Sequence, residues 1–423
     1  MDESSPLDAT PELTEIESQK RSSGIGNALA VPLLAVFTAL VIGALLIAFT
    51  DPVVLAAWRN FFGDPLGALA ATWHSIAVAY GALLSGSLGL VEIWKALGVW
   101  LHGGGTEALA QALVPLSESL TASVPFIFAG LAVALGFQGG LFNIGAEGQL
   151  LVGALSAVYV GYNFPGLPIY IHLPMAIMAG FIGGALWGAI PGLLKAYTGG
   201  HEVITTIMMN WIIISISAWL LKVGGPMSRG ELPITPEVLP SAQIPQFFST
   251  QGNRFHGGFF LALAVAFFVY WLLYKSIKGF EIRMLGANFK AAVYSGINVK
   301  HLWVFVMALS GGLAGLAGTV QALAIDRWVG MGFSAGMGFD SIALALLGRS
   351  HPLGVVLAAI LFGTLRNGAT RMQSVAHIPI DIITIIQALV IVFIAAPEII
   401  RWLYRLRQPE DDEAPIFSTS WGS

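Results

Sequence analysis

Residues 140–149 read GLFNIGAEGQ, and they place Asn143, Glu147 and Gln149 among glycines between two long apolar segments. A carboxylate at membrane depth is costly unless it faces protein or water. Glycines beside it indicate a broken helix or close backbone packing, which a membrane tolerates only inside a bundle or next to an aqueous cavity. The stretch therefore predicts the interior of a membrane transport protein.

The composition of the whole chain also indicates a membrane protein. Of its 423 residues, 56% are hydrophobic and only 10% are charged, whereas soluble domains carry about 25% charged residues. The mean hydropathy is +0.77. The small net charge of −4 gives no footprint for nucleic acid, and Cys 0 excludes disulfides, thiolate metal sites and cysteine nucleophiles.

Ten apolar segments predict an all-α, polytopic membrane protein. A helix of about 18 or more residues with few charges is long enough to cross the hydrocarbon core. The stretch 338–349 is shorter and is typical of a half-helix, and 351–367 is a further expected span. The remaining eight segments are 30–50, 118–138, 147–163, 173–195, 202–221, 257–275, 302–325 and 381–402.

Basic residues set the predicted orientation. They gather in 275–300 and near the C-terminus, which places both regions and the N-terminus in the cytoplasm if crossings alternate. The apolar stretch 66–91 contains His74 and many small residues, so we interpret it as interfacial rather than spanning. The expected organisation is an acidic cytoplasmic tail (1–28), a first transmembrane helix (29–50), an outer segment with interfacial helices (51–117), the main transmembrane domain (118–402) and a cytoplasmic tail (403–423).

A faint internal repeat is also present. The sequence GAEGQLLVGAL (145–155) resembles GFDSIALALLG (338–348), with Glu147 opposite Asp340. Counting crossings, the two copies enter the membrane from opposite sides. This is the pattern of an inverted repeat with a discontinuous helix, which places a transport pathway at the repeat interface.

The loop KSIKGFEIRMLGANFKAAVYSGINVK (275–300) predicts a short cytoplasmic helix. Asn288 can cap this helix and Gly296 can end it. An apolar face on such a helix requires a partner groove, whereas the alternative is a basic loop that serves only orientation. The residues expected to share that face are Phe289, Ala292 and Val293.

Signals for an enzyme are poor. GFSAG (332–336) matches the G-x-S-x-G pattern, but that motif requires a strand before it and a helix after it. His201 and Glu202 are adjacent, so their side chains diverge and form no metal pair. The dipeptide Gly-Lys never occurs, so the chain has no P-loop and ATP-driven transport would need another chain. We therefore expect no bound metal or cofactor.

Five segments together resemble the permease subunits of bacterial ABC importers. The resemblance is to the branched-chain amino-acid and simple-sugar permease superfamily, specifically to its nucleoside-type members, and it covers roughly 115–400. The segments are GLFNIGAEGQ, HEVITTIMMNW (201–211), GFEIRMLGANFKAAVYSGI (279–297), GFDSIALALLGRSHPLG (338–354) and LFGTLRNGA (361–369).

The resemblance implies a multi-pass protein of the bacterial plasma membrane that works with other chains. These are a second permease subunit, cytoplasmic ATPases that hydrolyse ATP, and an extracytoplasmic substrate-binding protein. The ATPases would dock on the segment matching 279–297. Its matching positions, with Phe289 from the expected apolar face, are Glu281, Arg283, Gly286, Asn288, Phe289, Ala291 and Gly296.

The resemblance also implies which residues line the pathway or support it. For a neutral nucleoside, hydroxyl-matching amides and hydroxyls suit substrate contact, and structural support is the alternative for each. Those residues are Asn143, Gln149, Thr205, Thr206 and Asn210. The charged residues of the bundle could instead form internal ion pairs; they are Glu147, Asp340, Arg349 and Arg366.

Three other functions remain open at this level. One is an ABC permease for another simple sugar or for branched-chain amino acids. Another is a proton-coupled secondary transporter that uses Glu147 or Asp340 as a proton carrier. The third is an intramembrane enzyme, for which GFSAG is the only feature.

Overall fold

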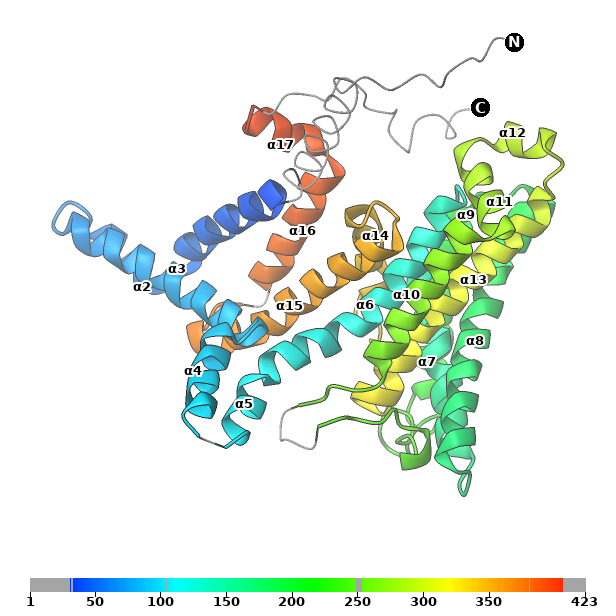
Figure 1. Cartoon of the computed structure of the whole chain (residues 1–423), viewed down its shortest axis with the longest axis horizontal. Coiled ribbons are helices and arrows are strands. Elements are labelled where there is room, and N and C mark those ends of the chain that lie inside the picture. The colour runs from blue at the N-terminus through cyan, green and yellow to red at the C-terminus, as the bar shows by residue number, and fades with distance from the viewer. Residues whose placement is uncertain (1–30, 32, 104, 249–252, 380, 406–423) are drawn as a thin grey trace, which may run out of the picture.

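The computed structural model describes residues 31, 33–103, 105–248, 253–379 and 381–405. Helices dominate this part of the chain, and three isolated bridges are its only β-structure. The all-α prediction is therefore confirmed (Figure 1). The predicted tail 1–28 lies outside the described residues, as does most of the tail 403–423.

The centre of the bundle is α6, which is apolar on all sides and buried along most of its length, as expected for a core helix. It packs against α13 and α15, and α13 packs in turn against α7 and α8. The bounds are α6 Val114–Gln138, α7 Ala146–Asn163, α8 Ile169–Thr198, α13 Val299–Val320 and α15 Pro352–Ala376.

Glycines allow α8 and α13 to meet backbone to backbone. A Cβ on Gly311 would lie 2.3 Å from the carbonyl oxygen of Gly184, and a Cβ on Gly315 would lie 2.5 Å from that of Gly180. Any larger residue would separate the two helices. Small residues at these positions thus permit the close helix packing.

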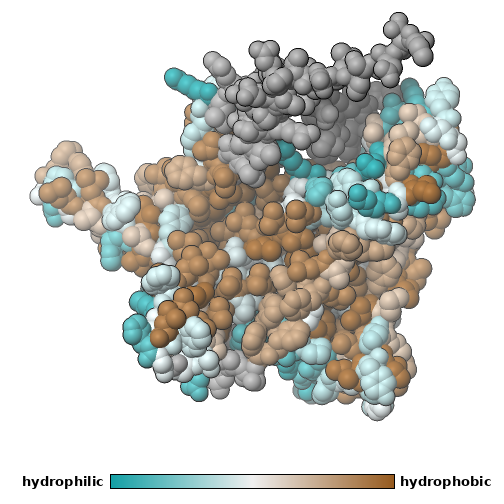
Figure 2. All heavy atoms as spheres, in the orientation of Figure 1, coloured by the Kyte–Doolittle hydropathy of each residue, from teal (hydrophilic) through white to brown (hydrophobic). Residues whose placement is uncertain are grey.

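The other elements cover the bundle and its two ends. In Figure 1, α11 and α12 lie at one end and η1 at the opposite end, and Figure 2 shows a broad apolar belt between polar ends. The bounds are α9 Glu202–Leu221, η1 Pro240–Ala242, α10 Gly258–Lys275, α11 Ile277–Ala287, α12 Phe289–Tyr294, the π-helix η2 Gln321–Asp326, α14 Met337–Leu347, α16 Asp381–Ala395 and α17 Pro397–Leu403.

Eight of the described helices are long and apolar enough to cross a membrane, or nine if α16 and α17 count as one span. The predicted span at 381–402 is not one continuous helix: α16 and α17 meet at 88°, because Pro397 cannot continue the preceding helix. The predicted half-helix is confirmed as α14, an apolar helix of 11 residues. The predicted span 147–163 forms α7, whose polar first turn keeps it out of the eight.

The segment after the first helix (Leu33–Thr50) is also helical, and each of its first two helices begins at an Asp-Pro pair. Asp51 and Asp64 each cap the helix that follows, and proline occupies the first position in both. Helix α3 has the length and composition of a membrane span and packs against α15, so the interfacial placement of 66–91 stays a prediction. The bounds are α2 Pro52–Arg59, α3 Pro65–Ser87, α4 Leu90–Leu101 and α5 Glu107–Ala112.

Candidate translocation site and coupling segment

Helices α7 and α14 begin at the same point inside the bundle. A Cβ on Gly338 would lie 2.2 Å from the backbone nitrogen of Glu147, so only glycine fits where the two N-termini meet. From there α7 runs to the end that holds η1, where Leu239 N–H donates to the Gly161 carbonyl (3.0 Å). Helix α14 runs the other way, and Gln138 Nε2 donates to the Ser350 carbonyl just beyond it (3.1 Å). The two helices that the faint repeat pairs thus start together and diverge to opposite ends.

Glu147 joins the two helix starts. Its side chain is buried, and its two carboxylate oxygens accept hydrogen bonds from Gly336 N–H (3.0 Å) and Gly338 N–H (2.7 Å). A carboxylate is stabilised at a helix N-terminus by unpaired amides and by the helix dipole. Among the described residues, no ion pair within 4 Å links Glu147 to Arg349 or Arg366, so the ion-pair alternative does not apply to Glu147.

Asn143 holds the non-helical stretch before α7. Its Nδ2 donates to Gln149 Oε1 and to Ser310 Oγ, both at 2.8 Å. Its Oδ1 accepts from Gly145 N–H (2.9 Å) and from Gln149 Nε2 (3.2 Å). Both donors and both lone pairs of the amide are therefore used inside the chain, which makes Asn143 and Gln149 supports of the broken helix.

Asn210 supports the same break from α9. Its Oδ1 accepts from Gly148 N–H and its Nδ2 donates to the Ile144 carbonyl, each at 2.9 Å. Thr205 and Thr206 donate their hydroxyl protons to carbonyls of their own helix. Glu147, the five predicted amide and hydroxyl residues and Asp340 can be compared in this respect. Asp340 alone among them has a side chain for which the described part of the chain shows no hydrogen bond.

The segment predicted to dock the ATPases (279–297), here called the coupling segment, directly contacts the non-helical stretch before α7. A Cβ on Gly286 of α11 would lie 2.2 Å from the Gln138 carbonyl oxygen and 2.9 Å from the Gly140 nitrogen. Arg283 Nε donates to the Leu273 carbonyl (3.0 Å) and so ties α11 to α10. Among the residues that the structure describes, Glu281 pairs only with the exposed Lys278 on the same helix (2.8 Å), and this pair contributes little to stability. The backbone of α11 therefore lies directly against the start of the GLFNIGAEGQ stretch.

The short helix predicted after Asn288 is present as α12. Asn288 Oδ1 accepts from Ala291 N–H (3.0 Å), and Gly296 follows the helix with φ +77°. The predicted apolar face is divided, however. Ala292 is buried against its own chain, whereas Phe289 is 48% exposed and stacks on Trp303 with ring centroids 5.6 Å apart.

Trp303 extends the contact from α12 to α9. Lys195 Nζ lies 5.2 Å from the centroid of the Trp303 ring and forms an ion pair of 2.6 Å with Glu202, the first residue of α9. Glu202 is buried, so this pair is screened less than a surface pair. Sequence reasoning missed Trp303 and Lys195, because nothing local in the sequence indicates that they meet.

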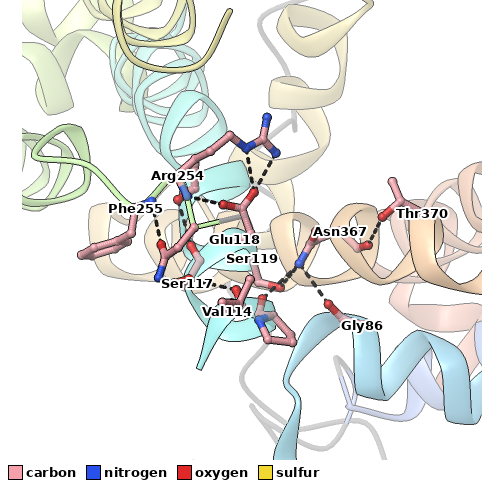
Figure 3. A network of polar contacts seen from close by, with 12 residues as sticks. Gly86, Val114, Ser117, Glu118, Ser119, Arg254, Phe255, Asn367 and Thr370 are labelled. Atoms are coloured by element: carbon pink, nitrogen blue, oxygen red, sulfur yellow. Dashed lines mark hydrogen bonds and ion pairs between the residues drawn. The ribbon is translucent and has the colours of Figure 1, made fainter. Parts of the chain in front are cut away.

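A second polar network lies towards the opposite end of the bundle (Figure 3). The Arg254 side chain donates to Glu118 Oε2 through Nε (2.9 Å) and NH2 (2.7 Å), and its backbone N–H donates to Oε1. Nearby, Asn367 Nδ2 donates to the Gly86 carbonyl and to Ser119 Oγ, both at 3.0 Å. This network ties α3, α6, α15 and the segment before α10 together, and the sequence interpretation did not anticipate it.

His256, two residues after Arg254, predicts a pH-dependent stability. Burial, together with the Arg254 charge, lowers the pKa of His256 to about 4 from 6.5. The unfolded chain then binds a proton more readily, so this stability is complete above pH 6.5 and is lost as pH falls towards 4. At pH 5 the loss is about 2 kcal/mol, at ~1.4 kcal/mol per pKa unit. Thermal unfolding in detergent should show a lower midpoint at pH 5 than at pH 8.

His256→Asn provides the matched control for this prediction. Gly258 N–H donates to His256 Nδ1, and an asparagine Oδ1 can accept the same bond without titrating. The variant should therefore retain most stability at pH 8 and lose less on acidification than the wild type. An unchanged pH dependence would assign the acid sensitivity to another group.

The GFSAG stretch does not have the structure of a nucleophile elbow. Residues 331–336 form turns after the π-helix η2, with no preceding strand, and Ser334 is buried. A nucleophile elbow requires a strand-to-helix turn that exposes the serine. The intramembrane-enzyme alternative therefore loses the only feature that supported it.

Comparison with known proteins assigns the chain to a family. A family model described as the permease component of branched-chain amino acid transport systems matches residues 116–395. The guanosine ABC transporter permease protein NupP of Bacillus subtilis is 36% identical over 89% of this chain and 95% of its own length. The nucleoside ABC transporter permease protein NupB of Lactococcus lactis is 31% identical, over 77% and 90%. The glucose ABC transporter permease protein of Haloferax volcanii is 35% identical, over 67% and 76%.

The chain belongs to this family of ABC transporter permeases. It is a multi-pass membrane protein and a transport component rather than an enzyme. No solved structure matches it.

Proposed function

We propose that this chain is one transmembrane subunit of an ATP-driven importer for nucleosides. The observation that carries the proposal is the similarity to the guanosine and nucleoside permeases. The match extends over 95% of the length of the guanosine permease and 90% of the length of the nucleoside permease. In this proposal the chain lies in a bacterial plasma membrane with both termini in the cytoplasm. It pairs with a second permease chain and receives substrate from an extracytoplasmic binding protein.

Cytoplasmic ATPase subunits bind and hydrolyse ATP in this proposal, and this chain itself binds no cofactor. They dock on α11 and α12, where Phe289 and Val293 are each about half exposed. Two contacts support transmission from this surface to the pathway. Gly286 of α11 lies against Gln138 and Gly140, and the Phe289–Trp303–Lys195–Glu202 series leads from α12 to α9.

The broken region supplies the element that changes state. Neither α7 nor α14 continues through the point where they meet, so α9, α11 and the non-helical stretch 139–145 can shift against α14 without unwinding a long helix. Such a rearrangement around a central site is the usual basis of alternating access. Glu147 serves as an anchor, because backbone amides already occupy both of its carboxylate oxygens.

A simple sugar is the second candidate substrate, since the glucose permease relative is 35% identical. The decisive experiment measures uptake into vesicles that contain this chain with its importer partners. Radiolabelled guanosine, glucose and leucine are compared, with ATP on the cytoplasmic side and an ionophore that collapses the proton gradient. We expect guanosine uptake that requires ATP and survives the ionophore.

Glucose or leucine uptake without guanosine uptake would replace the proposed substrate. Guanosine uptake that stops with the ionophore and ignores ATP would instead revive the proton-coupled alternative.

A further inference from the structure

Two charged side chains near the middle of the bundle stand out because the described part of the chain gives them no hydrogen-bond partner. Asp340 lies in the first turn of α14 and is partly exposed, and Arg366 lies on α15 and is exposed. Arg366 and Glu147 are the charged groups whose fields act on the Asp340 carboxyl. No ion pair within 4 Å joins Asp340 to Arg366 among the described residues.

The Arg366 side chain extends towards the membrane centre. Its neighbour Asn367 contacts Ser119, in the second turn of α6. The Arg366 guanidinium lies 5.5 Å from the ring centroid of Phe126, seven residues further along α6. Because an α-helix rises ~1.5 Å per residue, the Arg366 guanidinium lies about 10 Å deeper along α6 than the contact between Asn367 and Ser119. Long basic side chains near a membrane surface usually extend outward to water, so Arg366 does the opposite.

An exposed guanidinium at this depth is stable only where water or another protein meets it. The same holds for the partly exposed Asp340 carboxylate. Phe126 is only 2% exposed, and its ring forms a cation–π contact with the Arg366 guanidinium. These placements indicate an aqueous region or a protein-covered surface beside α14 and α15, and not a surface covered by lipid; only an aqueous region leaves both charges open to a ligand.

Three other residues of the segments 338–354 and 361–369 have packing roles. Gly338 lies against the Glu147 backbone, and Gly363 lies against Ser123 of α6, where a Cβ would meet the backbone nitrogen at 2.7 Å. Asn367 bonds to α3 and α6. These contacts explain the presence of Gly338, Gly363 and Asn367, which leaves Asp340 and Arg366 available for a ligand.

We propose that Asp340 and Arg366 form the polar recognition pair of the translocation pathway. They bind a neutral substrate that offers two adjacent donors to the carboxylate and an acceptor to the guanidinium. A carboxylate only accepts and a guanidinium only donates, so the pair selects a ligand with both kinds of edge. This inference rests on the proposed nucleoside transport and adds its substrate chemistry.

Two parts of a nucleoside have the required pair of donors. One is the vicinal diol of ribose, and the other is the edge of guanine that carries N1–H and the 2-amino group. Guanine also offers O6 and N7 as acceptors for arginine. The two sources are distinguished by inosine, which lacks the 2-amino group, and by 2′-deoxyguanosine, which lacks one hydroxyl.

The test compares uptake of guanosine, inosine and 2′-deoxyguanosine by the complete importer with wild-type chain, Asp340→Asn or Arg366→Gln. Asp340→Asn should raise the KM for guanosine about tenfold or more, as expected for loss of a charge-assisted hydrogen bond. It should also erase one wild-type preference. Loss of the preference for guanosine over inosine assigns the carboxylate to the base, and loss of the preference for guanosine over 2′-deoxyguanosine assigns it to the sugar.

Arg371→Gln is the matched control, because Arg371 lies on the same helix and pairs loosely with Glu92 at 3.7 Å. It should leave KM and both preferences unchanged. The extracytoplasmic binding protein that delivers the substrate is the same in every experiment. A changed preference among the three nucleosides is therefore caused by the substitution in this chain. A variant chain that still stimulates the ATPase activity of its partner subunits in the assembled importer is folded.

Two results would overturn the inference while nucleoside transport stands. One is an assembled Asp340→Asn importer with wild-type KM and wild-type preferences. The other is recovery of wild-type uptake when Asp340→Asn and Arg366→Gln are combined, which would show that the two charges only neutralise each other. A wild-type importer that takes up none of the three nucleosides would overturn the proposed function as well.

Discussion

Replacing Glu147 with leucine should abolish transport and lower the amount of folded protein in the membrane. The substitution leaves the amides of Gly336 and Gly338 without acceptors at the point where α7 meets α14. Each buried unsatisfied group costs about 1–3 kcal/mol, which is a large share of a typical stability of about 5–15 kcal/mol. Protein level by fluorescence-detected gel filtration and guanosine uptake at matched level are the measurements.

Glu147→Gln separates the anchor from a proton carrier. Glutamine keeps one carbonyl acceptor but presents an amide donor to the second backbone N–H, so we expect an intermediate loss of stability and appreciable uptake. A proton carrier would lose all uptake with glutamine as with leucine. Complete loss of uptake by an assembled Gln variant with normal ATPase stimulation would therefore contradict the anchor role.

Phe289→Asp should detach the ATPase subunits from an otherwise folded chain. Phe289 is half exposed on α12, and an unpaired carboxylate enclosed in an apolar contact costs several kcal/mol. Because ~1.4 kcal/mol corresponds to tenfold in affinity, the ATPase should be lost on purification. Co-purification of the ATPase with the affinity-tagged variant is the measurement.

Trp303→Ala is the companion variant, since it removes the Phe289 stack and the Lys195 contact but leaves the Phe289 side chain in place. It should retain the ATPase and lower the uptake gained per ATP hydrolysed. If Phe289→Asp co-purifies normally and transports normally, α12 is not the docking helix. If Trp303→Ala couples as well as the wild type, transmission runs through Gly286 alone.

Features that depend on neighbouring residues were predictable from the sequence. The cap at Asn288, the end of α12 near Gly296 and the short helix α14 all follow from local residue preferences. The spans followed from length and apolarity, except at Pro397, where the chain turns sharply although its composition stays apolar.

Features that depend on distant pairing were not predictable. Glu147 was expected to be buried and bonded, but its partners lie 189 and 191 residues away along the chain. The same applies to the stack of Phe289 on Trp303, which uses part of the face that the sequence assigned to a partner. The Glu118–Arg254 pair joins residues 136 positions apart, and neither belongs to a recognisable motif.

In the proposed pathway, the meeting point of α7 and α14 would also determine the charge that a crossing molecule encounters. Each helix start contributes about half a positive charge, so the two together roughly balance the single negative charge of Glu147. Asp340 and Arg366 add one charge of each sign. The middle of the protein is therefore rich in polar groups and yet close to electroneutral, which matches the neutral cargo that we propose.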